Sequence, residues 1–127
     1  MANDLYTKGF GAVEYDNLIA GTTHPIDTKS VVLQGGQGVV KRGTVLGIIT
    51  ASGLAVPVDS TKSDGSEVAD CILTDDVDTT DGDVVATAYS SGLFNRKALI
   101  FGGTDTVDKH ETRLRELGIF LKDNIPY

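Results

Sequence analysis

The hydrophobic positions of the chain form short runs separated by turn residues. From Leu18 onward, candidate strands rich in Val and Ile occupy residues 30–33, 44–50, 54–58, 69–74, 84–89, 93–95 and 98–101. Between them stand Gly-Gly-Gln-Gly at 35–38 and the pairs Ser52-Gly53, Asp64-Gly65, Asp81-Gly82 and Gly102-Gly103. Short strands at such spacing predict a mainly β fold, a compact, barrel-like domain of the β-tulip type. No segments of helical length alternate with the strands, which argues against a parallel α/β sheet.

One short helix is predicted near the C-terminus. Its apolar stripe has helical spacing and consists of Val107, His110, Leu114 and Leu117. Asp105 or Thr106 can cap its N-terminus, and Gly118 suits the left-handed position after its last turn. Residues 119–121 then predict a final strand, and residues 124–127 a loose tail.

The first 17 residues have neither helical nor strand periodicity, yet they carry Tyr6, Phe10 and Tyr15 among the eight aromatic residues of the chain. Disordered segments normally lack large apolar residues, so an extended N-terminal arm that orders on a partner is favoured. The alternative is an edge strand packed on its own domain. The predicted organisation is therefore an arm over residues 1–17 and a β-rich domain over residues 18–127.

Length and charge narrow the class of protein. A chain of 127 residues is typical of one domain, and the net charge is −7. Residues 59–83 hold nine carboxylates and one lysine, a charge of −8, which leaves the rest of the chain at +1. Such a surface repels phosphate backbones, so no nucleic-acid partner is expected. The N-terminus does not resemble a secretory signal and no apolar run has membrane-spanning length, so we expect no membrane partner and synthesis in the cytoplasm of the cell that makes the protein.

The histidines, the cysteine and the serines of the chain do not form a recognisable catalytic pattern. His24 precedes Pro25 in a loop-like segment, and His110 lies on the helix stripe, so both favour surface or packing roles. The nucleophile pattern Gly-x-Ser-x-Gly is absent. Cys71, the single cysteine, lies in an apolar strand and is expected to be buried and inert. We expect no enzyme, no catalytic residues, no cofactor and no metal site.

Two loops superficially resemble ligand-binding motifs. Residues 38–44 have the glycine spacing of a P-loop, but Thr44 replaces the phosphate-binding lysine. The acidic residues 75–83 do not fit an EF-hand, because Asp81 stands at the glycine position and Thr87 at the bidentate glutamate position. A solvated loop is favoured, and weak cation binding stays open.

A carrier domain is an alternative. Residues 40–46 resemble the turn and strand of biotinyl and lipoyl carrier domains, in which a glycine turn introduces a strand. The modifiable lysine of those domains lies within Met-Lys-Met or Asp-Lys-Ala, and neither tripeptide occurs here. A small β-barrel carrier or ligand-binding domain of a larger complex remains the second hypothesis.

Five phrases occur in an order that resembles one known family. They are Leu18-Ile-Ala-Gly21, Lys41-Arg-Gly-Thr-Val-Leu-Gly47, Asp64-Gly-Ser66 with Ala69-Asp-Cys-Ile-Leu73, Ser91-Gly-Leu-Phe-Asn95, and Leu114-Arg-Glu-Leu-Gly-Ile-Phe-Leu121. Together they resemble the lambda-type head decoration proteins of tailed phages over about residues 15–121.

The resemblance implies a structural capsid decoration, or cement, protein of the virion. Such a protein binds as a homotrimer at three-fold sites on the outer surface of the expanded icosahedral head and stabilises it against DNA pressure. Its N-terminal arm would add strands to the major capsid protein. From side-chain chemistry alone, the expected capsid-binding residues of the arm are Leu5, Tyr6, Phe10, Val13 and Tyr15.

Overall fold

In a computed structural model, the structure describes residues 18–21 and 24–123. The strands are β2 (Ile19–Gly21), β3 (Asp27–Leu33), β4 (Val39–Val40), β5 (Val45–Ile48), β6 (Ala55–Pro57), β7 (Ala69–Leu73), β8 (Val77–Asp78), β9 (Val84–Asn95) and β10 (Ile119–Lys122). The helical elements are the 3₁₀ turns η1 (Arg96–Ala98) and η2 (Val107–Lys109) and the α-helix α2 (Glu111–Leu117). The predicted strand-rich domain with a short helix near the C-terminus is confirmed.

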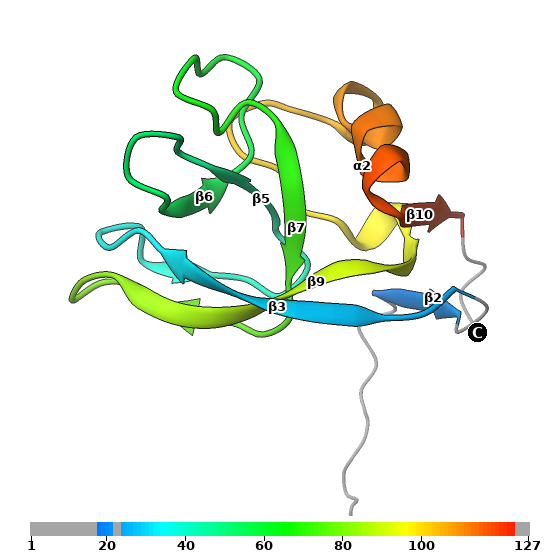
Figure 1. The fold of residues 1–127 in the computed structure, drawn as a ribbon, viewed down its shortest axis with the longest axis horizontal. Helices are drawn as coiled ribbons and strands as arrows, with labels where there is room; N and C mark the ends of the chain where they lie inside the picture. Colours follow the sequence, from blue (N-terminus) through cyan, green and yellow to red (C-terminus); the bar gives the residue numbers. More distant parts are fainter. Residues whose placement is uncertain (1–17, 22–23, 124–127) are drawn as a thin grey trace, which may run out of the picture.

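Five strands close into a barrel in the order β3-β9-β7-β5-β6 (Figure 1). β6 completes the ring through a single parallel pair with β3, Leu33 opposite Ala55. The predicted strands at 30–33, 44–50, 54–58 and 69–74 correspond to β3, β5, β6 and β7, each displaced by a few residues at the ends. The short strands β4 and β8, which pair with each other, were not predicted.

Two apolar clusters form the core, one on each side of the barrel wall. The interior cluster takes residues from every barrel strand: Val31, Leu33, Val40, Leu46, Ala55, Cys71, Leu73 and Ala88. The second cluster lies between the wall and the layer of α2 and β10: Leu18, Val45, Val58, Ala69, Ile72, Phe94, Leu114 and Ile119. Because successive side chains of a strand point to opposite faces, neighbours such as Cys71 and Ile72 enter different clusters. This double burial explains the apolar runs Val45-Leu46 in β5 and Cys71-Ile72-Leu73 in β7.

β9 is one strand of 12 residues, whereas the sequence predicted two strands at 84–89 and 93–95. The chain continues as a strand through the gap between the two predicted segments, with Gly92 at a φ of 144°. A Cβ at Gly92 would stand 3.0 Å from the Phe94 ring, so this glycine accommodates the bend and the close packing. β9 changes partners there: β3 and β7 flank its first part, and β2 and β10 its last residues.

Two local predictions were wrong. Residues 98–101 do not form a strand; η1 covers the first of them, and an isolated bridge joins Ile100 to Thr44. The α-helix begins at Glu111, after η2, and its N-cap is His110. Neither predicted residue caps α2. Asp105 binds Ser60 and His110, and Thr106 precedes η2 without making a side-chain capping hydrogen bond.

The end of the helix agrees with the prediction. Gly118 is left-handed at a φ of 91°, and its N–H donates to the carbonyls of Leu114 and Arg115. Leu114 is fully buried, with Leu117 packed beside it, so the predicted stripe does face the core. β10 follows at once, as expected, and runs parallel to the end of β9.

Candidate functional site at the two ends of the chain

The first two described strands of the domain both pair with the long strand β9. β2 and β3 both run antiparallel to β9, β2 along Leu93 and Phe94 and β3 along Val84–Ser91. The Asn95 N–H donates to the carbonyl of Leu18 at 2.7 Å, and the Leu18 side chain is 1% exposed in the core. This anchored residue follows directly on the predicted arm. β9 then ends at Asn95 and turns into η1, so it offers no further strand to residues before Leu18.

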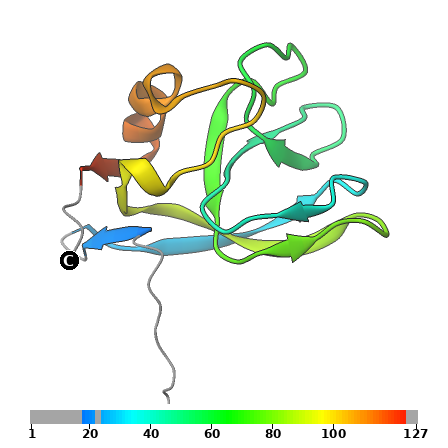
Figure 2. The ribbon, with the colours of Figure 1, turned by 180° about the vertical axis from the view of Figure 1, so that it is seen from behind.

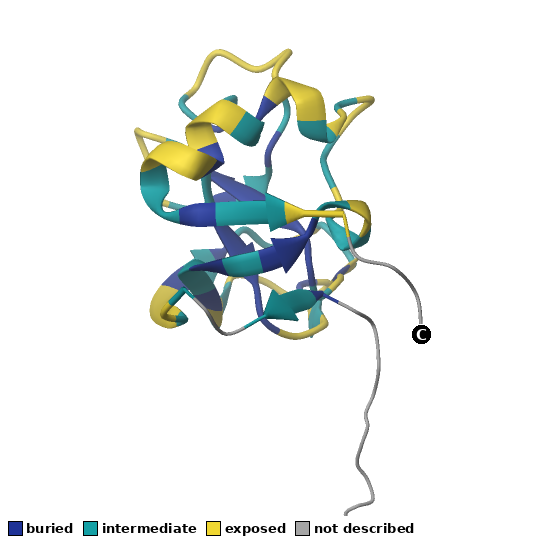
Figure 3. Ribbon diagram, turned by 90° about the vertical axis from the view of Figure 1, so that its right-hand side faces the viewer, coloured by how far each residue is buried: buried dark blue, intermediate teal, exposed yellow. Residues whose placement is uncertain are grey.

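The C-terminal strand β10 pairs with the same end of β9, on the edge opposite β2. β10 pairs with β9 in parallel, and Lys122 stands opposite Asn95. Figure 3 shows β9 between β10 and β2, with the buried surface behind them. Leu18 and Lys122 therefore flank one residue, Asn95, although they are far apart in sequence. Both ends of the described chain lie at one edge of the domain.

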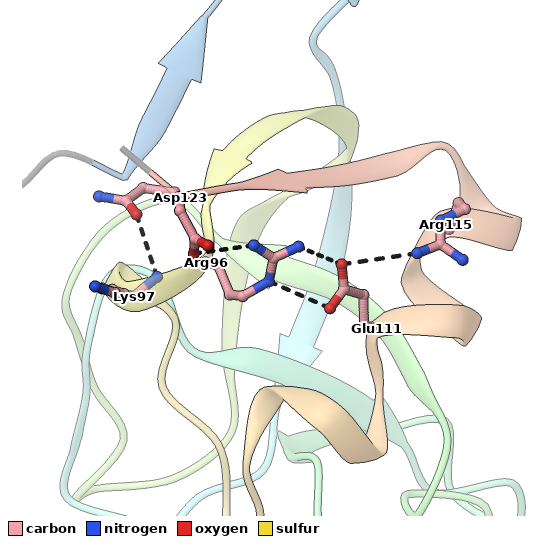
Figure 4. Close-up of polar contacts among 6 residues, drawn as sticks. Arg96, Lys97, Glu111, Arg115 and Asp123 are labelled. Carbon is pink, nitrogen blue, oxygen red and sulfur yellow. Dashed lines mark hydrogen bonds and ion pairs between the residues drawn. The ribbon is translucent and has the colours of Figure 1, made fainter. Parts of the chain in front are cut away.

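A polar cluster fixes this edge (Figure 4). The Arg96 guanidinium donates from two nitrogens to both carboxylate oxygens of Glu111, and its third nitrogen lies 2.9 Å from Asp123. Arg115 lies 3.7 Å from the same Glu111 carboxylate. The Arg96 hydrogen bond holds the pKa of Glu111 below its usual range. The cluster joins α2, η1 and the residue after β10. Because Arg96 follows Asn95, which pairs with Leu18, the cluster also holds the C-terminal end of the described chain close to Leu18.

The side chains predicted to bind a capsid lie outside the described residues. Leu5, Tyr6, Phe10, Val13 and Tyr15 therefore stay predictions. What the structure adds is the anchor of the arm, Leu18 with Asn95, which periodicity did not indicate. The apolar phrase Leu18-Ile-Ala-Gly21 carried no information on its partner strand.

The segment between η1 and η2 runs along the side of the domain seen in Figure 2. A groove opens beside Leu18. Its volume is about 780 Å³, and it is lined by the apolar residues Leu18, Ala98 and Ile100 and the charged residues Lys41, Arg42, Asp75 and Asp76. Gly43 has a φ of 91°, and a Cβ there would stand 3.0 Å from the carbonyl oxygen of Ala98 and 3.5 Å from the Leu18 side chain. We call it the Ile100 groove.

The buried histidine lies outside this edge. His110 Nε2 is 2.6 Å from Asp105 Oδ2, and that carboxylate also accepts from the N–H and the hydroxyl of Ser60, each at 2.7 Å. Burial raises the pKa of the Asp105 carboxyl, but the hydrogen bonds from His110 and Ser60 outweigh it and leave the pKa below the ordinary value. The carboxylate stands between serine and histidine, so the histidine cannot take the serine proton as a general base would. The cluster connects two loops.

The other residues singled out from the sequence have structural roles. The His24 ring stacks on Phe120 at a centroid distance of 4.3 Å. Cys71 is fully buried, and desolvation raises the pKa of its thiol to about 12, which disfavours the reactive thiolate. Both observations agree with the packing roles expected for these residues.

The carboxylates of the acidic region largely hold its turns. Asp78 accepts from the N–H and hydroxyl of Thr80, Asp83 accepts from the Gly35 N–H, and Asp76 accepts from the Arg42 N–H. Among residues 18–21 and 24–123, no group of three or more His, Cys, Asp or Glu side chains is placed to hold a metal ion. In the same part of the chain, no helix has the length and apolarity needed to cross a membrane.

Comparison with known proteins adds the deciding observation. The sequence model of the family described as bacteriophage lambda head decoration protein D matches residues 7–120. The chain belongs to this family. The match spans the barrel, α2 and the start of β10, and it enters the arm far enough to include Phe10, Val13 and Tyr15 but not Leu5 or Tyr6. No curated protein matches the chain.

Membership of the family identifies a component of the phage virion that decorates the capsid. The family is structural and not an enzyme family. This favours decoration over the carrier-domain hypothesis, whose resemblance was confined to residues 40–46.

Proposed function

We propose that the protein binds the outer surface of the expanded icosahedral head as a homotrimer at three-fold sites and stabilises the shell against the pressure of packaged DNA. Each N-terminal arm adds a strand to the major capsid protein. The observation that carries this proposal is the anchor at Leu18, where the chain is paired with Asn95 but β9 ends. Arm residues that continue this strand need a partner from elsewhere, and an edge of the capsid protein supplies one.

The anchor also transmits force. Leu18 is buried in the core cluster that includes Phe94, Leu114 and Ile119, so a pull on the arm acts on the whole second cluster. The Arg96 cluster joins α2 and β10 to the same edge. An arm attached to a loosely packed loop would unfold its own base under load, whereas this attachment lies in a buried core cluster.

A trimer with three arms binds more tightly than a single arm does. A single arm loses conformational entropy on ordering, which lowers its affinity. On a trimer, the second and third arms bind as intramolecular events, which raises the affinity by roughly 10²–10⁴ without any new type of contact. Leu5, Tyr6, Phe10, Val13 and Tyr15 provide the side chains that fill pockets along the capsid strand and set its register.

Binding to expanded heads that lack the protein tests the proposal. We expect the variant with Tyr6, Phe10 and Tyr15 all replaced by Ser to lose most head occupancy. A matched variant with Asn3, Thr7 and Asn17 replaced by Ser should bind as the wild type does. Sedimentation of the free and head-bound protein reports the trimer separately. If the aromatic variant binds as well as its control, the body and not the arm makes the contact.

A further inference from the structure

The chain contains two Asp-Gly pairs, Asp64-Gly65 and Asp81-Gly82, and both aspartates are exposed. An aspartate that precedes glycine is chemically unstable, because the glycine nitrogen can attack the carboxyl carbon of the aspartate side chain. Glycine has no side chain of its own to obstruct this approach, and its backbone adopts the required conformations readily. The contacts of the two pairs differ, and the difference decides which of them reacts.

At the first pair, hydrogen bonds occupy both reacting groups. Asp64 Oδ1 accepts from the Ser66 N–H at 3.0 Å and from the Ser66 hydroxyl at 2.5 Å. These bonds hold the pKa of Asp64 below its usual range, which disfavours the neutral carboxyl that the reaction needs. The Gly65 N–H donates to the Glu67 carboxylate at 2.8 Å. Attack of the Gly65 nitrogen on Asp64 therefore requires these contacts to open first.

At the second pair, both reacting groups are accessible. The exposed Asp81 side chain makes no hydrogen bond or ion pair with the part of the chain that the structure describes. The Gly82 N–H makes only a long hydrogen bond of 3.4 Å, to the Thr79 carbonyl, which already accepts from the Gly36 N–H at 2.7 Å. Apart from its chain neighbours, no described residue has an atom within 4 Å of the position of a Cβ on Gly82. The Gly82 nitrogen therefore has room to approach the Asp81 carboxyl carbon.

We propose that Asp81-Gly82 is a site of spontaneous isoaspartate formation. The Gly82 nitrogen forms a bond to Cγ of Asp81, and the amide proton and the carboxyl hydroxyl leave together as water. Water then adds to the resulting succinimide ring. Breaking the bond from the Gly82 nitrogen to Cγ restores aspartate, whereas breaking its bond to the main-chain carbonyl carbon leaves isoaspartate, in which the backbone runs through the side chain. Water is the only co-reactant, and the mass of the chain is unchanged.

Isoaspartate lengthens the backbone of the turn by one carbon atom, beside the loop between β3 and β4 (Figure 1). A Cβ on Gly35 would stand 2.5 Å from the Gly82 carbonyl carbon, so the two backbones are in contact. The Gly35 N–H donates to Asp83 and the Gly36 N–H to Thr79, on either side of the altered residue. Conversion should weaken these bonds and loosen the loop. Because proteins of an assembled virion are not replaced, the altered form accumulates with the age of the particle.

Ageing the purified full-length protein in heavy-oxygen water at neutral pH, followed by digestion in ordinary water, tests the proposal. Each passage through the succinimide introduces one heavy oxygen atom, whether aspartate or isoaspartate results, and fragmentation of the peptides by mass spectrometry locates it. In the folded protein, we expect incorporation at Asp81 to exceed that at Asp64 by roughly tenfold or more. In guanidinium chloride, where the hydrogen bonds of Asp64 are lost, the two rates should become similar.

Asp81→Glu is the matched variant, because it keeps the charge but requires a larger, less favourable ring. It should remove incorporation at this position and leave that at Asp64 unchanged. Absent incorporation at Asp81, equal incorporation at the two sites of the folded protein, or incorporation that survives Asp81→Glu would each overturn the proposal. Neither the reaction nor the assay involves capsids, so failure here leaves the proposed function untouched.

Hydrogen exchange tests the loosening of the loop between β3 and β4 separately. The isoaspartate form is separated from the unaltered protein by chromatography, and amide exchange at Gly35 and Gly36 is compared between the two. We expect faster exchange in the isoaspartate form. Equal exchange would overturn the predicted loosening, since the turn would then accommodate the additional carbon atom without losing its bonds.

Discussion

Replacing Asp105 by Ala should destabilise the domain more than any exposed charge replacement. The carboxylate is 1% exposed and accepts hydrogen bonds from the Ser60 N–H, the Ser60 hydroxyl and His110 Nε2. It connects the loop after β6 with the segment that leads into α2, 45 residues later in sequence. The His110 ring is itself 4% exposed and stacks on Phe101 with a centroid distance of 5.5 Å. Water therefore has little access to replace the lost acceptor.

The loss in free energy of unfolding can be calculated from the donors of Ser60 and His110 that Asp105→Ala would leave without an acceptor. A hydrogen bond to a charged group contributes about 1.5–3 kcal/mol, and a buried donor without an acceptor costs about 1–3 kcal/mol. Removing one partner of a buried pair typically costs about 3–5 kcal/mol in total, the value that we expect for Asp105→Ala. For a chain of this length that corresponds to a fall of about 10–20 °C in Tm. Asp105→Asn keeps an acceptor oxygen and should lose less.

Urea unfolding followed by circular dichroism measures the loss, with Asp108→Ala as the matched control. Asp108 is an exposed carboxylate three residues away. Its replacement should change the free energy of unfolding by at most about 0.5 kcal/mol. If Asp105→Ala and Asp108→Ala have the same free energy of unfolding, the buried cluster does not hold the two loops and the reasoning is wrong.

Three further predictions concern the arm, pH and backbone packing. Deleting residues 2–16 should shift Tm by a few degrees at most, because the anchor at Leu18 remains, while head occupancy collapses; a melting curve and a head-binding assay on one preparation decide this. Asp105 and Glu111 have pKa values below the ordinary 3.8 and 4.5, so their contribution to stability is complete above pH 4.5 and is lost as the pH falls through the lower, folded-state values. Urea midpoints measured from pH 7 to pH 2 should show this fall, and Asp105→Asn should flatten it. Gly47→Ala should cost roughly 2–3 kcal/mol in chemical unfolding, since a Cβ there would stand 2.3 Å from the Ser66 carbonyl oxygen; a loss below 0.5 kcal/mol would show that the neighbouring loop moves aside at little cost.

Residues close in sequence were predicted well because their behaviour depends on local chemistry. Gly118 ends α2 in the left-handed conformation, which a residue without a side chain adopts readily. β5 and β7 appear where apolar residues run together, since strands buried on both faces need them on both faces. Leu18, at the start of an apolar phrase of the sequence, is buried in the core.

What the tertiary structure decided is which distant residues meet. Periodicity shows that residues 84–95 suit a strand, but not that β9 exchanges β3 and β7 for β2 and β10 as it passes Gly92. Asp105 suits a helix cap by its chemistry, but its buried carboxylate instead accepts hydrogen bonds from Ser60 and pairs with His110. Leu18 and Lys122 likewise lie on either side of Asn95 only because the folded chain brings β2 and β10 to the end of β9. Hydrogen-bond pairing across a sheet depends on how the whole chain closes, and no local pattern of hydrophobic and polar residues contains that information.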